Sequence, residues 1–331
     1  MKFAAALALV GYASANHHNL RDMYAKYLVQ HNKNYITEAE FEARFENFAK
    51  THHDIMYHNS KNAGYTLGHN FLSDWTDAEK AVLNGYKAKE MVTDAEVLEF
   101  DASNGGIDWR KSLKSVNHVK NQGQCGSCWA FSTTGSIESN TEIATGEVPT
   151  WLSEQQLVDC STQNNGCEGG LYDYAFEYVA SNGLEGESDY PYWAMDGTCS
   201  FKKDKVRNHK VDSYTPYNDI NAGDAETFKA RLAKGPVSVA IQANQAVFQQ
   251  YTGGVIPDDG SCGTQLDHAV LCVGWGNDGG DDYAIVKNSW GSSWGVGGFV
   301  KLAFGAGKSF WGGKTSACGF LNQSSQVHVD A

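Results

Sequence analysis

The first third of the chain carries apolar residues at the period of a helix. A first amphipathic helix is predicted from apolar positions three or four apart, at Leu20, Met23, Tyr24, Tyr27 and Leu28. Thr37, followed three residues later by Glu40, has the spacing of a capping box and predicts the start of a second, longer helix. The apolar stripe expected on this second helix consists of Phe41, Phe45, Phe48, Ile55 and Met56.

The later part of the chain combines helices with runs typical of strands. A helix is predicted from Cys128 to about Gly146, where glycine suits the C-terminal cap, and another over 172–180. Strands are predicted over 237–241, 269–275 and 283–286, and the remainder is also interpreted as strands. Residues 276–280 (G-N-D-G-G) predict a hairpin between the last two strands. Helices that precede strands favour an α+β fold over a parallel α/β fold.

Three segments of different character divide the chain. Residues 1–15 have a charged start, a short apolar run and an A-x-A site, as in a cleavable signal peptide. Residues 16–103, called the prosegment below, lack cysteine, and the polar stretch 87–106 is interpreted as a linker. All eight cysteines lie within 104–331. We therefore expect a removable segment attached to a disulfide-bonded one, made in an oxidising compartment.

Composition excludes several classes of function. The 331 residues, 41% of them apolar, suffice for about two domains. A formal charge of −13 without a dense Lys/Arg cluster argues against a nucleic-acid partner. No stretch after the signal reaches about 18 apolar residues, so no membrane span is predicted. No cofactor is expected.

The most specific stretch of the sequence is 122–131, Q-G-Q-C-G-S-C-W-A-F. It resembles the C-G-[SA]-C-[WY] signature of papain-type cysteine proteases, in which a His and an Asn follow downstream. His268 lies 140 residues after Cys128, and Asn288, within the sequence N-S-W-G, lies 160 after it. Cys128 is therefore the expected nucleophile, and His268 its base. Asn288 is expected to orient the imidazole, and Gln122 to form an oxyanion hole with the Cys128 amide.

General chemistry supports these roles. A free cysteine has a pKa of about 8.5 and is a poor nucleophile until it ionises. A helix N-terminus favours the thiolate, and a neighbouring imidazolium lowers the pKa of the thiol further, to roughly 3 to 4 in such pairs. The alternatives for Cys125-x-x-Cys128 are a redox pair or half of a zinc site. Neither a thioredoxin-like context nor a second Cys/His pair accompanies it, so no metal is expected.

The number of cysteines predicts one further free thiol. Seven cysteines remain when the nucleophile is set aside, an odd number. Cys272 lies in an apolar, strand-like run and is interpreted as buried and unpaired. The other six allow fifteen pairings, among which the residues themselves do not decide.

From Leu20 to the C-terminus the chain resembles the cathepsin L branch of the papain family. The resemblance implies a helical lobe and a β-barrel lobe, with the active site in the cleft between them and a helical inhibitory propeptide. It implies a role for Trp290 in shielding the bond between His268 and Asn288 from water. The disulfides that it implies are Cys125–Cys167, Cys160–Cys199 and Cys262–Cys318.

The same resemblance implies a substrate-binding wall and a pocket. The glycines Gly169 and Gly170 would let backbone pair with an extended peptide. The pocket for the residue two before the scissile bond would be lined by Leu171, Tyr172, Ala240, Leu266 and Ala269. Gln323 stands at the position of the pocket floor, and we expect preference for a hydrophobic or aromatic residue. No long His-bearing insertion follows Gly170, which favours an endopeptidase.

The prosegment resembles the family's inhibitory propeptide. Its E-x3-R-x3-F-x2-N-x3-I-x3-N motif is matched by Glu40, Arg44, Phe48, Ile55 and Asn59, with Thr51 in place of the first Asn. The G-x-N-x-F-x-D motif appears with Leu72 in place of Phe and ends at Asp74. We expect acid to release this segment by protonating paired carboxylates such as Asp74, with cleavage between about Phe100 and Gly106.

The expected partners are protein and peptide substrates, the chain's own propeptide and cystatin-like inhibitors. The mature enzyme is expected to be a monomer in a lysosome, an acidic vacuole or the secreted fluid. Asn322-Gln323-Ser324 is a glycosylation sequon, whose closeness to the expected pocket argues against occupancy.

Overall fold

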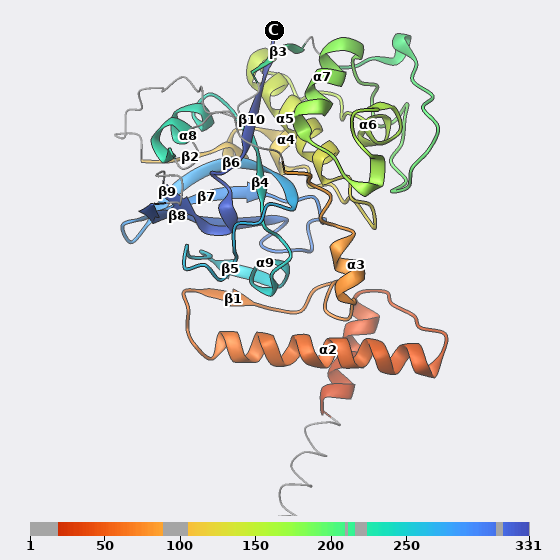
Figure 1. The fold of residues 1–331 in the computed structure, drawn as a ribbon, viewed down its shortest axis with the longest axis vertical. Coiled ribbons are helices and arrows are strands. Elements are labelled where there is room, and N and C mark those ends of the chain that lie inside the picture. The colour runs from red at the N-terminus through yellow and green to blue at the C-terminus, as the bar shows by residue number, and fades with distance from the viewer. Residues whose placement is uncertain (1–18, 89–104, 209–210, 216–223, 309–313, 331) are drawn as a thin grey trace, which may run out of the picture.

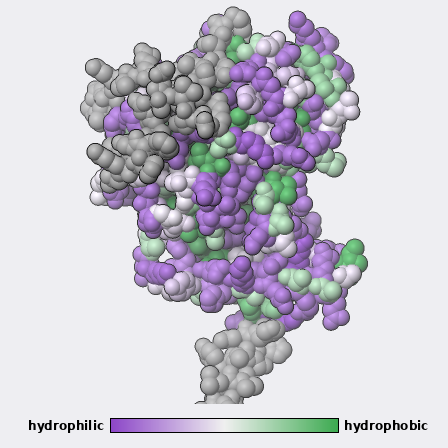
Figure 2. Space-filling view, viewed as in Figure 1, coloured by the Kyte–Doolittle hydropathy of each residue, from purple (hydrophilic) through white to green (hydrophobic). Residues whose placement is uncertain are grey.

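The structure is a computed structural model that describes residues 19–88, 105–208, 211–215, 224–308 and 314–330. Its prosegment helices lie at one end of the molecule, below the strands of the C-terminal region (Figure 1). Most of the surface in view is polar, with hydrophobic residues in small groups (Figure 2). The predicted signal peptide and most of the stretch 87–106, including most of the expected cleavage region, lie outside the described residues.

Two crossed helices form the first part of the prosegment, as the apolar spacing predicts. The first covers 19–30, and α2 covers Glu38–Asn59. Thr37 caps α2 by accepting a hydrogen bond from the Glu40 amide. The helices pack through a cluster of aromatic rings contributed by Tyr24, Tyr27, Phe45 and Phe48. Met56, which was placed on the apolar stripe of α2, is 57% exposed and so does not pack with the other residues of the stripe.

After α2 the prosegment turns back along the C-terminal region. Strand β1 (Tyr65–Leu67) pairs antiparallel with β5 (Tyr251–Gly254), and the short helix α3 (Asp77–Ala81) follows. A complete capping box starts α3: Thr76 accepts from the Glu79 amide, and the Glu79 carboxylate accepts from the Thr76 amide. Arg44 of α2 then forms a two-pronged ion pair with Glu79, which ties the two helices together.

Helices form one lobe of the C-terminal region. The central helix α5 (Cys128–Thr145) ends at Gly146, whose left-handed φ of 74° explains why glycine stands there. Its neighbours are α4 (Lys114–Asn117), α6 (Glu154–Cys160) and α7 (Tyr172–Asn182). Short 3₁₀ helices occur at Trp109–Lys111, Gly166–Glu168, Lys203–Lys205 and Ala317–Gly319.

An antiparallel sheet forms the other lobe, with the strand order β3-β10-β4-β6-β7-β8-β9 and β2 beside β6. Its strands are β2 (Ile107–Asp108), β3 (Val211–Thr215), β4 (Val237–Ile241), β6 (His268–Asp278), β7 (Asp281–Lys287), β8 (Phe299–Lys308), β9 (Lys314–Ser316) and β10 (Ser324–Val329). The α8 (Ala225–Leu232) and α9 (Ala246–Gln249) helices lie between strands. The predicted α+β fold with two lobes is confirmed.

Two details of the sequence interpretation were wrong. The stretches that became α6, α8 and α9 had been interpreted as strands, although Ser153 and Asp224 cap α6 and α8 through their side chains. The hairpin between β6 and β7 turns through Gly279 and Gly280 alone, because both strands extend further than predicted. Both glycines have positive φ angles of 65° and 107°, which favour glycine.

The three disulfides implied by the resemblance are all present. They join Cys125 to Cys167, Cys160 to Cys199 and Cys262 to Cys318. Cys272 is free and buried in β6, as predicted. Cys128 is the other free cysteine of the described residues.

Prosegment residues belong to the cores of both lobes. Ile55, Leu72 and Leu83 pack in the apolar cluster of the sheet lobe. Tyr86 packs in the cluster of the helical lobe. Because these side chains are buried against the C-terminal region, removal of the prosegment must expose apolar surface on both lobes.

Candidate active site

Cys128 is the first residue of α5, and its side chain is fully buried. Its sulfur accepts a hydrogen bond from the Ala269 amide, with the nitrogen 3.4 Å from the sulfur. Ala269 follows His268, the first residue of β6. The helical and sheet lobes therefore meet at this sulfur, which also lies at the positive end of the α5 dipole.

His268 and Asn288 are in direct contact. The Nε2 atom of His268 lies 2.8 Å from Asn288 Oδ1, and the Ser289 amide donates to the same oxygen at 2.8 Å. Because a backbone N–H can only donate, this contact identifies the oxygen of the Asn288 amide, and Nε2 must donate to it. In the neutral ring, Nδ1 then carries the lone pair. That atom is buried with no hydrogen-bond partner in the described structure.

Trp290 covers this pair. Its ring is 1% exposed and lies 5.0 Å from the His268 ring, measured between centroids. Phe248 meets Trp290 edge-on at 5.5 Å and lies 6.3 Å from His268. Aromatic rings therefore lie on two sides of His268, and the expected shielding of its bond to Asn288 from water stays a prediction.

Gln122 is held at every polar atom. Its backbone amide donates to Ser289 O, and its Oε1 accepts from Ser289 Oγ, both at 2.8 Å. Its Nε2 donates to Cys125 O at 2.8 Å and to Leu83 O, a prosegment carbonyl, at 3.0 Å. One hydrogen of the Gln122 side-chain amide thus binds a carbonyl of the C-terminal region, Cys125 O, and the other binds a carbonyl of the prosegment, Leu83 O.

The prosegment lies directly against Gly126, which is close to Cys128 in the chain, and against Gly170. The Gly170 amide donates to Gly85 O at 2.8 Å, and the Lys87 amide donates to Gly170 O at 3.1 Å, in a parallel bridge between Tyr86 and Gly170. A Cβ on Gly85 would lie 1.8 Å from Gly126 O, so only glycine fits this approach. Residues 83–87 are called the cleft segment below. The linker interpretation was therefore wrong for Lys87, which pairs with Gly170.

Tyr86 packs in the same apolar cluster as the residues predicted to line the pocket. All the predicted apolar lining residues pack in its cluster: Leu171, Tyr172, Ala240, Leu266 and Ala269. Its ring lies 5.2 Å from that of Tyr172, and its hydroxyl donates to Gln323 Oε1 at 2.9 Å. Gly169 precedes the pairing residue Gly170 and has a φ of 115°. Gly170 thus pairs with the cleft segment, and Gly169 also lies against it, because a Cβ on Gly169 would lie 2.2 Å from Gly85 O.

Burial keeps the cysteine and histidine neutral in this arrangement. Desolvation raises the pKa of the Cys128 thiol to about 11, although the Ala269 and Gly85 amides partly counter it. Desolvation also lowers the pKa of His268 to about 4, against the opposing effect of its bond to Asn288. At neutral pH the groups are therefore a thiol and a neutral imidazole while the cleft segment is in place.

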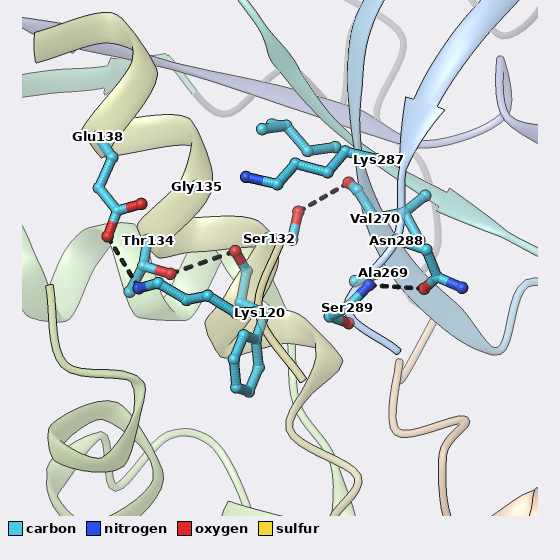
Figure 3. A pocket seen from close by; sticks show the side chains of 12 residues that line it. Lys120, Ser132, Thr134, Gly135, Glu138, Ala269, Val270, Lys287, Asn288 and Ser289 are labelled. Carbon is cyan, nitrogen blue, oxygen red and sulfur yellow. Dashed lines mark hydrogen bonds and ion pairs between the residues drawn. The ribbon is translucent and has the colours of Figure 1, made fainter. Parts of the chain in front are cut away.

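A small cavity of about 20 Å³ lies behind the site, between α5 and the strands β6 and β7 (Figure 3). Lys120 reaches into it and forms ion pairs with Glu138 and Glu154 at 2.9 and 2.6 Å. Ser132 Oγ donates to Val270 O across the lobes at 2.8 Å. The ion pairs of Lys120 lie within the helical lobe, whereas the bond from Ser132 to Val270 joins α5 to β6 of the sheet lobe.

Sequence reasoning missed the cleft segment and the partners of Gln122. Leu83, Gly85 and Tyr86 carry no motif that marks them. Gly85 and Tyr86 pair with Gly170 and Asp267, more than 80 positions away, and Leu83 O accepts from Gln122, 39 positions away. Ser289 lies in the N-S-W-G sequence, but its two contacts with Gln122 follow from the fold. Asn322 of the sequon is half-buried.

Two further properties concern the described residues only. No group of three or more His, Cys, Asp or Glu side chains there is arranged to hold a metal ion. None of the helices in the described ranges is long and apolar enough to cross a membrane.

Comparison with known families gives two matches. Residues 104–327 match the model of the papain family cysteine protease, and residues 24–79 match the cathepsin propeptide inhibitor domain (I29). Together the two matches cover both the prosegment and the C-terminal region.

Individual proteins are similar over most of the chain. Cysteine proteinase RD21A of Arabidopsis thaliana is 44% identical over 292 residues, 85% of this chain, and the alignment spans 62% of that protein's length. Cysteine protease XCP2 of the same plant is 42% identical over 91% of this chain and 86% of its own length. The structure of digestive procathepsin L2 proteinase from Tenebrio molitor larval midgut has a TM-score of 0.81 and 34% identity, covering 94% of this chain and 100% of that one.

Proposed function

This chain belongs to the papain family of cysteine proteases, and on that premise we propose that it hydrolyses internal peptide bonds with Cys128 as nucleophile. The observation that carries the proposal is the meeting of three groups. The Cys128 sulfur accepts from the Ala269 amide at 3.4 Å, and the neighbouring His268 is held by Asn288 at 2.8 Å with Nδ1 unprotonated.

The reaction follows from these groups. When the cleft segment has left, water and substrate reach the pair, and the proton of the Cys128 thiol moves to His268 Nδ1. The thiolate attacks the peptide carbonyl, and the imidazolium gives its proton to the leaving amine as the C–N bond breaks. Water then attacks the thioester while His268 accepts a proton from that water. The acid product leaves, and the thiol is regenerated.

Gln122 is proposed as an oxyanion donor together with the Cys128 amide. Support comes from its Nε2, which donates to a peptide carbonyl, Leu83 O, beside the cysteine. Removing one such donor from an oxyanion hole costs about 2.7–4 kcal/mol of transition-state stabilisation. Gln122→Ala should therefore lower kcat by roughly 100- to 1,000-fold.

The chain is proposed to be made as an autoinhibited precursor. The cleft segment pairs with Gly170, fills the pocket with Tyr86 and takes up the free hydrogen of the Gln122 amide. Each of these contacts blocks a group that substrate needs. Burial under the segment also opposes formation of the charged pair, as the pKa shifts of Cys128 and His268 indicate.

The pocket is proposed to prefer a hydrophobic or aromatic residue two before the scissile bond. Its apolar lining and its occupation by the Tyr86 ring support this preference. Peptides with Phe-Arg before the reporter group should be cleaved much faster than peptides with Arg-Arg. Near-equal rates would contradict the assignment.

A disulfide oxidoreductase is a weaker alternative. Its CxxC pair would need Cys125 free to bond with Cys128, but Cys125 is bonded to Cys167. A secretory route, to an acidic vacuole, a lysosome or the outside, is proposed from the predicted signal peptide and the disulfides. The mature enzyme is also proposed to be a monomer and to bind cystatin-like inhibitors.

Acid activation followed by active-site titration tests the function. The precursor is incubated at about pH 4–5 and then titrated with an epoxysuccinyl inhibitor. The Cys128→Ala variant is treated in the same way as a control. Peptidase activity that disappears on stoichiometric labelling of Cys128, with none in the variant, supports the proposal. A Cys128→Ala variant that retains activity contradicts it.

A further inference from the structure

Ser127, the residue before Cys128, has an unusual hydrogen bond for the N-cap of a helix. An N-cap serine ordinarily accepts a hydrogen bond from an amide of the first turn. Ser127 makes no such bond. Its Oγ lies 2.6 Å from the hydroxyl of Tyr192 instead. The capping group of α5 is thus directed away from its own helix.

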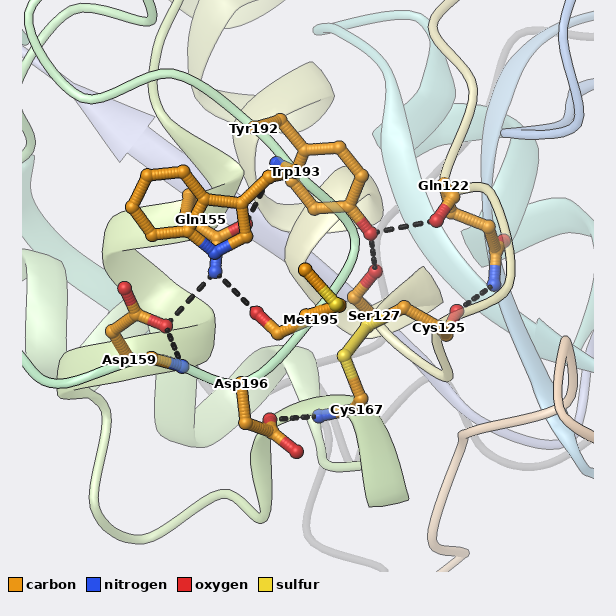
Figure 4. The surroundings of a disulfide bond; sticks show 12 residues. Gln122, Cys125, Ser127, Gln155, Asp159, Cys167, Tyr192, Trp193, Met195 and Asp196 are labelled. Atoms are coloured by element: carbon orange, nitrogen blue, oxygen red, sulfur yellow. Dashed lines mark hydrogen bonds between the residues drawn. A yellow bond between two sulfur atoms is a disulfide. The ribbon is translucent and has the colours of Figure 1, made fainter.

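Tyr192 also contacts the proposed oxyanion donor Gln122. Its hydroxyl lies 2.7 Å from Gln122 O (Figure 4). A carbonyl oxygen only accepts, so the single hydrogen of the Tyr192 hydroxyl must go to Gln122. Ser127 must then donate its own hydrogen to Tyr192. The direction of both hydrogen bonds is fixed: Ser127 to Tyr192, and Tyr192 to Gln122.

No other contact in the described structure holds the Gln122 carbonyl. Ser289 fixes the Gln122 amide and Oε1, and Cys125 O takes one hydrogen of Nε2. The Tyr192 ring is braced edge-on against Phe131 in the first turn of α5, with centroids 4.9 Å apart. The hydroxyl therefore links the backbone that carries one oxyanion donor to the helix that carries the other.

We propose that Tyr192 is a positioning residue for peptide hydrolysis, whose hydroxyl sets the spacing between Gln122 and the N-terminus of α5. The proposal rests on the proposed function. Tyr192 touches neither the sulfur nor the substrate carbonyl in this role. It acts through Gln122, so its loss should impair stabilisation of the oxyanion and leave the nucleophile unchanged.

The sequence offers a matched control two residues away. The Tyr190 hydroxyl also makes two hydrogen bonds, donating to Asp159 Oδ2 at 2.7 Å and accepting from the Ser200 amide at 3.2 Å. Neither partner contacts Gln122 or Cys128 in the described structure. Tyr190→Phe thus removes a similar hydroxyl, two residues away in the sequence, without touching the proposed link.

The experiment compares Tyr192→Phe, Tyr190→Phe and wild type, each expressed as the full chain and acid-activated. Reaction with 2,2′-dipyridyl disulfide measures the nucleophilicity of Cys128 without any oxyanion and also counts active sites. Hydrolysis of an amide substrate measures the complete reaction. Tyr192→Phe should lower kcat per active site about tenfold. Its KM, its thiol reactivity and the pH profile of that reactivity should match wild type. Tyr190→Phe should stay within about twofold of wild type.

A double variant tests whether the effect passes through Gln122. In the Gln122→Ala background, adding Tyr192→Phe should cost less than about twofold, because the group being positioned is already absent. If Tyr192→Phe does not fold, Ser127→Ala removes the other end of the link and should lower kcat with unchanged thiol reactivity.

Several results would overturn the proposal. The first is a kcat for Tyr192→Phe equal to that of wild type or of Tyr190→Phe, and the second is a loss of thiol reactivity in Tyr192→Phe that parallels its loss of kcat. The third is full additivity of the Tyr192→Phe and Gln122→Ala effects on kcat. The fourth is an unchanged kcat in Ser127→Ala. A wild type that reacts with the disulfide reagent but cleaves no peptide would refute the proposed function itself, which is a distinguishable outcome.

Discussion

Replacing His69 by phenylalanine should reduce the sensitivity of the precursor to acid. The His69 ring stacks on Phe48 with centroids 4.2 Å apart, and its Nε2 lies 3.0 Å from His52 Nδ1. A single hydrogen occupies that short contact, so one ring must donate and the other accept. Full protonation of both rings would place two N–H groups and two charges against each other. His69 Nδ1 is also buried without a partner.

The pKa of His69 gives the size of the effect. Burial, aided by the nearby His52 and His31, lowers the pKa of His69 from 6.5 to about 4. A histidine with a depressed folded-state pKa contributes stability that is present above pH 6.5 and is lost as pH falls toward 4. The full shift corresponds to about 3 kcal/mol at 1.36 kcal/mol per unit. Because the residue is only partly buried, solvent screening reduces this to roughly 1–2 kcal/mol.

The assay is thermal unfolding of the inactive Cys128→Ala precursor between about pH 7 and 4. Between these two pH values the free energy of unfolding should fall by roughly 1–2 kcal/mol more in the precursor with His69 than in His69→Phe. The phenylalanine keeps the stacking on Phe48 but cannot be protonated. The control is His53→Phe, next to His52 on α2, where the side chain is 81% exposed. Equal losses with and without His69, or an effect of the same size from His53→Phe, would refute the reasoning.

Three further predictions concern contacts of the prosegment and the site. Arg44→Ala should destabilise the precursor by about 1 kcal/mol at neutral pH. Because Arg44 lowers the pKa of Glu79 from 4.5 to about 2, thermal unfolding should show that difference shrinking as pH falls from 4.5 toward 2. Tyr86→Phe removes the bond to Gln323 and should weaken the precursor by about 0.5–1.5 kcal/mol, measured as earlier melting or faster activation. Trp290→Ala should cost about 3–5 kcal/mol in unfolding experiments, since the ring is fully enclosed.

Two kinds of group thus respond to acid in different pH ranges. Burial lowers the pKa of both His52 and His69, so they lose their contribution as pH falls below 6.5. Glu79 responds only below 4.5. Asp74, the carboxylate expected to release the prosegment, accepts hydrogen bonds from Tyr27 and Tyr35 at 2.9 and 2.7 Å. Its role in release stays a prediction.

Features that depend on neighbouring residues, such as helix ends and single strands, could be predicted from the sequence. The helix from Cys128 ends at Gly146 because a left-handed residue is needed there, and β4 was predicted with the bounds that it has. The helices α6 and α8 were missed because they have only 7 and 8 residues and bury polar as well as apolar side chains, so no polar and apolar faces can be told apart in the sequence. Their capping residues Ser153 and Asp224 were the available signal.

The candidate site was predicted by motif, and its contacts depend on distant parts of the chain. The placement of Cys128 beside Ala269 joins residues 141 positions apart. Tyr86 reaches Gln323 across 237 positions. Contacts between residues so far apart in the sequence depend on how the two lobes and the prosegment pack together. No local sequence pattern predicts that packing. The link through Tyr192 is of the same kind, because its hydroxyl reaches Gln122 across 70 positions.

The most direct test of the central claim is the pH dependence of Cys128 alkylation before and after acid activation, followed by mass spectrometry. In the precursor Cys128 should stay nearly unlabelled at neutral pH, because it is buried and its thiol pKa is raised to about 11. After activation it should react rapidly even at about pH 5, as a thiolate paired with an imidazolium, and His268→Ala should abolish this low-pH reaction. An activated enzyme whose Cys128 reacts only as pH approaches about 8.5, equally with and without His268, would contradict the account.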